Sequence, residues 1–324
     1  MMYPDIYFSP EWSNLYAEKE SGKADAFLLE DQYGKIYYPF IRRGITQTVF
    51  FDGYEDIITP YGFSGPIILA AEDNEAKERL VLKFDKEFCE YCMDANIVAE
   101  YVRFSPWLGN QKDFSSCYKV SPNRTTIGID LNIRDIWSGE ISSKRRNIIR
   151  HAQKLGVTVG FDFTGEMLDD FLKLYSLTIE RNNIGDYYLF SNDFLKRHFI
   201  ELKDNVFIAY ALLDGRCASV SFILQWGDYM HYHLSANDPD LFYSNANSLL
   251  LFETALYAQK HGCKYFMLGG GGASDKLSHF KKSFTKQGVY DFYIGKRIRN
   301  KEVYDALCEA APNVNQNYFP EYRA

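Results

Sequence analysis

The chain has 324 residues, of which 46% are apolar and 17% aromatic, so it can bury a sizeable core in one large domain or two ordinary ones. Its net charge of −7 argues against broad nucleic-acid binding, which needs many cations to displace counterions, and we expect no DNA partner. The six cysteines are scattered and the opening MMYPDIYFSPEW lacks the regions of a signal peptide, which favours a cytoplasmic protein.

The sequence also argues against a membrane-spanning protein and against a metal-binding protein. No apolar run approaches the roughly 20 residues that span a bilayer, so we expect no transmembrane segment. Cys89-Glu-Tyr-Cys92 is a single CxxC in a helical pattern, which is a weak zinc signal. We therefore expect no metal site.

The first half of the chain opens with a predicted hairpin, because two strand-like runs flank the turn residues Asp31 to Gly34. Two prolines and two glycines in 59–66 exclude regular structure there. Apolar residues then recur at three- and four-residue spacing, which predicts a helix. The expected elements are strands over 26–30 and 35–42, the helix over 74–96, a strand over 97–104, and further strands up to residue 131.

The second half repeats this theme of antiparallel strands, helices and a further strand. Asp214-Gly215 and Gly227-Asp228 are tight-turn dipeptides, so the three runs that they join predict an antiparallel meander. The expected helices cover 141–155, 167–182, 192–202 and 245–261. The expected strands cover 157–163, 206–213, 217–226, 229–235, 265–268 and 289–298. We predict an α+β protein of two domains, 1–130 and 131–324, each with a mixed, mostly antiparallel sheet flanked by helices.

Four glycines, Gly269 to Gly272, follow the apolar run that ends at Leu268. A phosphate-binding loop needs Gly-Lys-Ser/Thr at the start of a helix, and no lysine follows directly here. The glycines instead predict a sharp exit from the strand, where backbone passes close to substrate and N–H groups can bind an anion. Gly269 and Gly270 are therefore candidate substrate-binding residues.

Several stretches, in this order and spacing, resemble the Fem-type (FemABX) peptidyltransferases and their relatives in the GNAT superfamily of N-acetyltransferases. They are TPYGFSGP at 59–66, KRRNIIRHAQKLGV at 144–157, YHLSA at 232–236 with NANSLLLFE at 245–253, and LGGG at 268–271 with LSHFKKSF at 277–284. The resemblance implies two tandem GNAT-like domains with the active cleft between or beside them, and we assign the cleft to the C-terminal domain. It also implies transfer of an acyl or aminoacyl group to an amine.

In the peptidoglycan members of this family the donor is aminoacyl-tRNA and the acceptor is a cell-wall precursor peptide. This chain lacks a clear Arg/Gln-x-x-Gly-x-Gly/Ala segment, which binds coenzyme A pyrophosphate in ordinary acetyltransferases, and it lacks the coiled-coil arm of some Fem proteins. The expected donor is aminoacyl-tRNA or acyl-CoA, with no tightly bound cofactor. The alternatives are an acyl-CoA-dependent N-acyltransferase of a small amine or amino sugar, and a non-catalytic protein that binds a peptide or nucleotide-sugar.

The resemblance also assigns catalytic candidates. Lys281 matches the lysine of the family's Phe-Lys-x-x-Phe motif, where a fixed cation can stabilise the oxyanion, and Phe280 beside it is a substrate-binding candidate. The alternative for Lys281 is a solvated helix lysine. Tyr232 stands where similar proteins contact substrate, and strand alternation separates it from His231 and His233.

Other substrate-binding candidates lie outside that motif. Arg181 resembles an arginine that binds substrate phosphate or carboxylate, with Tyr187 just beyond it; the alternative is a cation that complements the helix dipole. The family uses basic residues near Lys35 and Arg42 to hold the phosphates of a nucleotide-linked acceptor. Alternation along a strand should place Lys35 and Arg42 on different faces.

The helix predicted over 141–155 carries a run of basic residues that no acidic residue interrupts. We expect its buried side to comprise Ile148, Ile149, Ala152 and Leu155. The basic face, with Arg145, Arg146 and Arg150 as donor-binding candidates, could meet a phosphate-rich donor such as tRNA. A small-molecule or peptide-bearing precursor, tRNA and a peripheral membrane contact are the candidate partners.

Overall fold

The computed structural model describes residues 3–46, 53–182, 185–270, 275–315 and 317–324, and the chain divides into two compact units. Unit 1 comprises Met1–Arg124 and Asp291–Ala324, and unit 2 comprises Thr125–Tyr290. Unit 2 is therefore inserted into the sequence of unit 1. Strands β6 (Lys119–Asp130) and β12 (Val289–Ile298) carry the chain across the two boundaries.

The sheet of unit 1 is mixed and mostly antiparallel, with strand order β1-β2-β3-β5-β12 and β4 paired to β2. Its hairpin is regular: every residue of β1 faces one of β2, from Lys23 opposite Arg42 to Asp31 opposite Gly34. Strands β3 and β5 run parallel. The remaining bounds are β1 Lys23–Asp31, β2 Gly34–Gly44, β3 Glu55–Ile58, β4 Ile67–Ala71 and β5 Ile97–Arg103.

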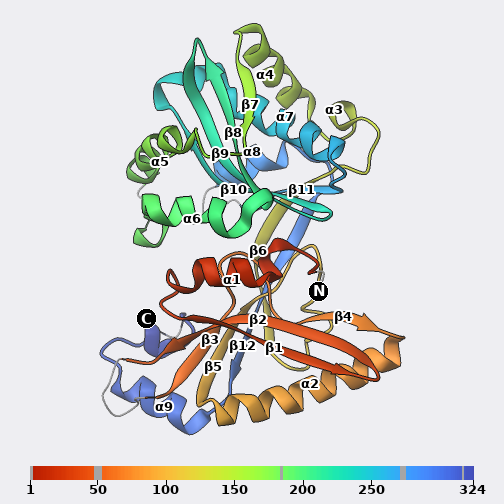
Figure 1. Ribbon diagram of the computed structural model, residues 1–324, viewed down its shortest axis with the longest axis vertical. Coiled ribbons are helices and arrows are strands. Elements are labelled where there is room, and N and C mark those ends of the chain that lie inside the picture. The colour runs from red at the N-terminus through yellow and green to blue at the C-terminus, as the bar shows by residue number, and fades with distance from the viewer. Residues whose placement is uncertain (1–2, 47–52, 183–184, 271–274, 316) are drawn as a thin grey trace. The chain divides into compact units, whose positions relative to one another are not determined.

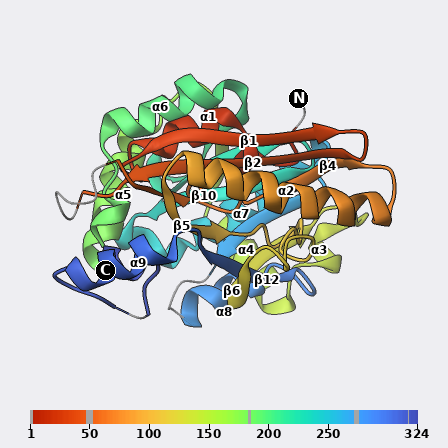
Figure 2. The ribbon, with the colours of Figure 1, turned by 90° about the horizontal axis from the view of Figure 1, so that it is seen from below.

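Two helices cover opposite faces of this sheet: α1 (Pro10–Ala17) lies on one side and α2 (Asn74–Asp94) on the other (Figures 1 and 2). Asp73 caps α2 by accepting a hydrogen bond from the backbone N–H of Ala76. One side of α2 is apolar at three- and four-residue spacing, and it packs Leu80, Phe84 and Phe88 into the core of the unit.

The C-terminal segment belongs to unit 1, which differs from the predicted division at residue 130. Strand β12 pairs antiparallel with β5, and α9 (Lys301–Ala310) packs against that strand. Arg299 bonds the carboxylate of Glu100, and Arg323 bonds that of Asp56, both of which are fully buried. Burying two carboxylates requires paired cations, so these contacts tie the segment to unit 1.

The strands of unit 2 are also mixed, and they follow the order β6-β11-β10-β9-β8-β7. Strands β10 and β11 run parallel, and the other described pairs within the unit are antiparallel. The predicted meander is confirmed, and Asp214 and Gly215 both take positive φ in the tight turn from β8 to β9. The bounds are β7 Thr158–Asp162, β8 Val206–Leu213, β9 Arg216–Trp226, β10 Tyr229–Asn237 and β11 Tyr265–Gly270.

Helices cover both faces of this sheet. Helices α4 (Ser143–Lys154) and α7 (Ala246–Lys260) share a core with Ile223, whereas the neighbouring Phe222 packs against Phe171 of α5 (Leu168–Asn182). Figure 1 shows α5 and α6 on one side of β8–β10 and α7 on the other. The remaining helices are α3 (Ile136–Gly139), α6 (Asn192–Leu202) and α8 (Asp275–Lys282).

The α+β class is confirmed, and each strand or helix predicted above exists within a few residues of its expected bounds. Elements that the sequence did not predict are short: α1, α3, α8, α9, β3 and β4. Among the described helices, none is long and apolar enough to cross a membrane.

Candidate functional site

The candidate site lies in unit 2, where the parallel strands β10 and β11 separate. Their pairing ends at His231 opposite Met267. Beyond that point β10 follows β9, and β11 follows β6 through Gly269 and Gly270, with a register shift in each strand. Backbone groups on the facing edges are then no longer paired with each other, so this is a place where a substrate can meet main-chain donors and acceptors.

Lys281 of α8 reaches this point of separation. Its Nζ donates a hydrogen bond to the carbonyl oxygen of Gly270 over 2.7 Å and lies 5.9 Å from the centre of the Tyr232 ring. A Cβ on Gly269, which has a φ of +73°, would lie 3.8 Å from the same Nζ. The structure thus brings together four residues that the sequence singled out: Lys281, Tyr232, Gly269 and Gly270.

The lysine is a buried cation, with 8% of its surface exposed. Burial lowers the pKa of Lys281 to about 8, because the charged form loses its hydration. At pH 7 about nine in ten molecules still carry the proton. Gly270 takes one of the three N–H groups, and no other hydrogen bond of Lys281 is formed with the residues that the structure describes, so two N–H groups can act on a substrate oxygen.

The hydroxyl of Tyr232 is held by α7. It donates to Oδ1 of Asn247 over 3.1 Å, and Ser219 of β9 donates to the same oxygen over 3.4 Å. Burial raises the pKa of Tyr232, so the phenol stays protonated near neutral pH. Asn247 is a functional candidate that the sequence did not identify, although it stands in the quoted NANSLLLFE stretch.

Phe280 and Arg145 fix the helix that carries the lysine. The guanidinium of Arg145 lies 4.5 Å from the Phe280 ring and 5.0 Å from the Phe284 ring. Its Nε donates to Ser283 over 2.8 Å, and its Nη1 donates to Ser248 of α7 over 2.8 Å. Arg145 therefore joins α4, α7 and α8, and burial lowers its pKa.

The other two donor-binding candidates on α4 also contact their own unit. Arg146 donates to the carbonyl oxygens of Trp137 and Ile141 over 3.1 and 3.2 Å. Arg150 is exposed, lies 5.0 Å from the Trp137 ring and donates to Asn147. The predicted buried side is wrong at one end, because the chain turns at Gly156 and leaves Leu155 39% exposed while Ile149 and Ala152 are buried.

Arg181 and Tyr187 lie elsewhere on unit 2. Arg181, at the end of α5, places its guanidinium 4.7 Å from the ring of Phe242 in the 3-10 helix η5 (Pro239–Ser244). Tyr187, in η3 (Asp186–Tyr188), packs edge-on against Tyr188 with ring centres 5.3 Å apart. The described contacts do not connect either residue with Lys281, so their substrate-binding roles stay predictions.

Lys35 and Arg42 lie in unit 1, where acidic residues pair with both. Lys35 contacts Glu30 over 2.6 Å, and Arg42 contacts Glu55 and Asp25 over 2.5 and 3.4 Å. The regular register of β1 and β2 keeps Lys35 and Arg42 on opposite faces. They therefore do not form one phosphate-binding pair, and their individual roles stay predictions.

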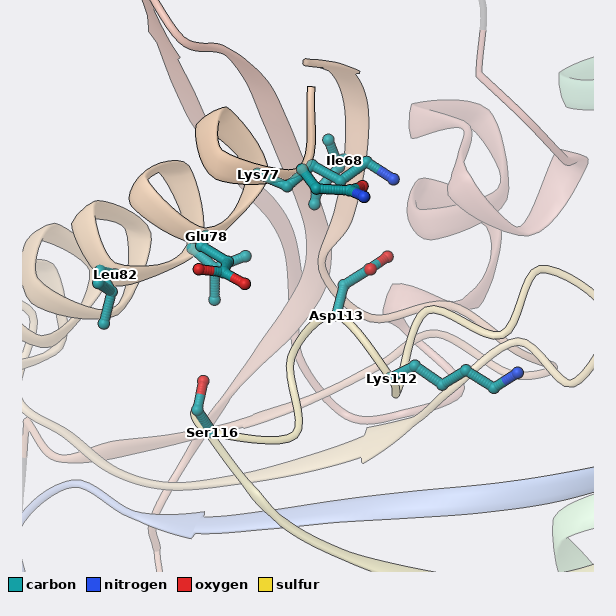
Figure 3. Close-up of a pocket in the computed structure, with 9 residues that line it drawn as sticks. Ile68, Lys77, Glu78, Leu82, Lys112, Asp113 and Ser116 are labelled. Atoms are coloured by element: carbon teal, nitrogen blue, oxygen red, sulfur yellow. The ribbon is translucent and has the colours of Figure 1, made fainter. Parts of the chain in front are cut away.

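A pocket of about 480 Å³ opens in unit 1 beside the start of α2 (Figure 3). Glu78, Asp113 and Ser116 stand around it, with Lys77 and Lys112 at its rim. No residue that the sequence singled out is among those that line it. The pocket carries charges of both signs, which is typical of a solvated surface.

The remaining candidates from the sequence are the rest of the glycine run and the histidines of β10. Gly271 and Gly272, the second half of the glycine run, lie outside the described residues. His233 of β10 stacks near His198 of α6, with ring centres 5.7 Å apart, on the face away from Tyr232. Within the part of the chain that the structure describes, no group of three or more His, Cys, Asp or Glu side chains is arranged to hold a metal ion.

Comparison with known proteins agrees with the resemblance stated from the sequence. Residues 142–282 match the acetyltransferase (GNAT) domain family. Among solved structures, FemX is similar at 14% identity over 93% of this chain and 94% of FemX, with a TM-score of 0.72. A conserved protein of unknown function from Bacteroides thetaiotaomicron shares 11% identity over 90% of this chain and 92% of that chain, with a TM-score of 0.59. L-PGS from Bacillus licheniformis shares 15% identity over 90% of this chain and 92% of that chain, with a TM-score of 0.52. None of the curated proteins matches the sequence.

Proposed function

Starting from a chain that is of GNAT type over residues 142–282 and FemX-like in fold, we propose that it transfers an acyl or aminoacyl group to an amine of a cell-envelope precursor of the peptidoglycan type. The amine nitrogen attacks the donor carbonyl carbon, and a C–N bond forms. The C–O bond of an aminoacyl ester, or the C–S bond of a thioester, breaks. The amine proton leaves with the departing oxygen or sulfur, so the reaction needs no oxidant or covalent enzyme intermediate.

The observation that supports this proposal is the buried, unpaired cation at the point where β10 and β11 separate. Lys281 has no acidic partner among its described contacts, and two of its N–H groups remain unused. A preorganised cation in a dry site stabilises the oxyanion that develops on the attacked carbonyl. Tyr232, held by Asn247, lies beside it and would position the reacting group.

Two donors fit this chemistry, aminoacyl-tRNA and acyl-CoA. On α4 only Arg150 of the three arginines that the sequence emphasised is exposed, because Arg145 is half-buried against α8 and Arg146 bonds backbone carbonyls. Lys144, Arg150 and Lys154 are the exposed basic residues of this helix. Any phosphate backbone that meets α4 would therefore be held by these three.

The test measures transfer and binding with both donor classes at low and physiological salt. Salt-sensitive binding of charged tRNA that is lost on replacing Lys144, Arg150 and Lys154 by Gln would assign an aminoacyl-tRNA donor. Replacing Lys276, an exposed lysine of α8, by Gln supplies a single loss of charge away from α4, with which each single replacement on α4 is compared. Acyl-CoA turnover without tRNA binding would assign an N-acyltransferase that uses CoA. Binding of precursor with no turnover from either donor would contradict the proposed activity.

A further inference from the structure

A set of uncharged polar side chains lines one face of the sheet beside Lys281. We call Ser219, Ser221, Tyr232, Ser235 and Asn247 the polar strip. Ser221 of β9 faces Ser235 of β10, and Tyr232 faces Ile223, which belongs to the core under α7. Residues 219, 221 and 223 alternate onto the same face, so the strip looks toward α7.

Ser221 stands out because its hydroxyl is fully buried and has no hydrogen-bond partner among the residues that the structure describes. It is close enough to Tyr232 to affect the pKa of that phenol, but the geometry of a hydrogen bond is not met. Buried hydroxyls in native proteins are nearly always satisfied, and an exception calls for a ligand or an ordered water. Ser244 is a useful contrast, since it is equally buried and donates to the carbonyl of Leu241 over 2.6 Å.

Asn247 offers hydrogen-bond donors at the same place. Its Oδ1 accepts from both Tyr232 and Ser219, which orients the amide. The two hydrogens on Nδ2 make no hydrogen bond with the residues that the structure describes. The strip thus presents the buried, unused hydroxyl of Ser221 and the unused amide N–H groups of Asn247.

The strip contains no charged side chain, and the adjacent cation, Lys281, is already assigned to the reacting carbonyl. An ion seated on the strip would lose its hydration without an opposite charge in return. A hydrocarbon seated there would leave the Ser221 hydroxyl unpaired. A hydroxyl or an amide satisfies both unused groups.

We propose that Ser221 and Asn247 determine specificity by binding a neutral hydroxyl or amide on the transferred acyl group, near its carbonyl. This inference rests on the proposed acyl transfer and names the class of acyl group: polar and short, rather than hydrocarbon. A site built to hydrogen-bond a substrate group discriminates strongly against the analogue that lacks it.

The test compares donors that differ by one hydroxyl. Seryl- and alanyl-tRNA form one pair, and 3-hydroxypropionyl- and propionyl-CoA form the other. We expect kcat/KM to favour the hydroxylated member by at least about tenfold in the wild type. Ser221→Ala should bring this ratio close to one. Asn247→Asp, which keeps the acceptor for Tyr232 and removes both N–H donors, should also reduce it. A wild-type ratio near one, or a ratio that Ser221→Ala leaves unchanged, overturns the proposal.

A second arm separates this inference from the proposed reaction. If neither donor class is turned over, the acyl-transfer proposal fails, and the strip is tested by titrating 3-hydroxypropionamide and propionamide while following the side-chain amide signal of Asn247. Equal responses to the two amides overturn the inference.

Thermal stability gives an independent check of the Ser221 hydroxyl. Ser244→Ala should lower Tm by about 2–4 °C, whereas Ser221→Ala should leave Tm unchanged or raise it. Equal losses would mean that the Ser221 hydroxyl is satisfied within the protein and would also overturn the proposal.

Discussion

Replacing Lys281 by Met should raise stability while abolishing activity. Burial lowers the pKa of this lysine from 10.5 to about 8, so folding at pH 7 carries a cost of about 3 kcal/mol for holding the charge. Methionine has a similar shape and no charge. Losing the hydrogen bond to Gly270 offsets about 1 kcal/mol, which leaves a net gain of about 2 kcal/mol.

The direction in which the unfolding free energy changes with pH follows from the lowered pKa of Lys281. The unfolded chain binds the lysine proton more tightly than the folded one, so wild-type stability should rise as pH increases from about 8 to about 10.5. The advantage of Lys281→Met should shrink over the same interval, and above it the wild type should be the more stable protein by the about 1 kcal/mol of the hydrogen bond. Denaturant unfolding of both proteins at pH 7, 9 and 10.5 measures this difference directly.

Lys282 supplies the matched control, because it is the next residue on α8 and is exposed. Lys282→Met should change unfolding free energy little and should retain transfer activity. A stability difference between wild type and Lys281→Met that stays constant from pH 7 to 10.5 would refute the reasoning from burial. Full activity in Lys281→Met would refute its role at the oxyanion.

Three further predictions concern neighbouring features. Transfer activity should fall as pH rises through about 8 if protonated Lys281 stabilises the oxyanion, whereas a rise through that pH would identify it as a base; initial rates from pH 6 to 10 decide. Arg145→Gln should cost roughly 1–3 kcal/mol, because Ser283 and Ser248 lose their partner and the two phenylalanine rings lose a cation, and Lys144→Gln, at an exposed position, is its control in thermal melts. Glu100→Gln should cost about 3–5 kcal/mol in urea unfolding, since it leaves the buried Arg299 charge with only the more distant carboxylate of Asp85, 3.8 Å away; a loss under 1 kcal/mol would contradict the pairing of Arg299 with Glu100.

Much of the fold could be predicted because its signals are local. The β1–β2 hairpin, α2 and the meander of β8 to β10 have strong periodicity and clear turn residues, and each is present. The return of residues 291–324 to unit 1 was missed. It depends on Arg299 meeting Glu100 and Arg323 meeting Asp56, contacts between residues about 200 or more positions apart that no local pattern encodes.

The same distinction between local and long-range signals applies to the residues of the candidate site. Lys281 and Tyr232 could be identified from short motifs, and the structure places them together. Ser221 and Asn247 could not, because their importance arises from cross-strand register and from a helix that packs over it. Arg145 was assigned to a donor from its place in a basic run, but the two aromatic rings that enclose it come from a segment 135 or more residues later.

Because unit 2 is inserted into the sequence of unit 1, the ribosome completes unit 2 before it completes unit 1. Unit 2 is complete once residue 290 has emerged, whereas unit 1 still lacks β12, α9 and the arginine that neutralises Glu100. Until that arginine is synthesised, folding unit 1 would bury an uncompensated carboxylate. Unit 2, which carries Lys281, can therefore fold first during synthesis, and unit 1 must wait for residues 291–324.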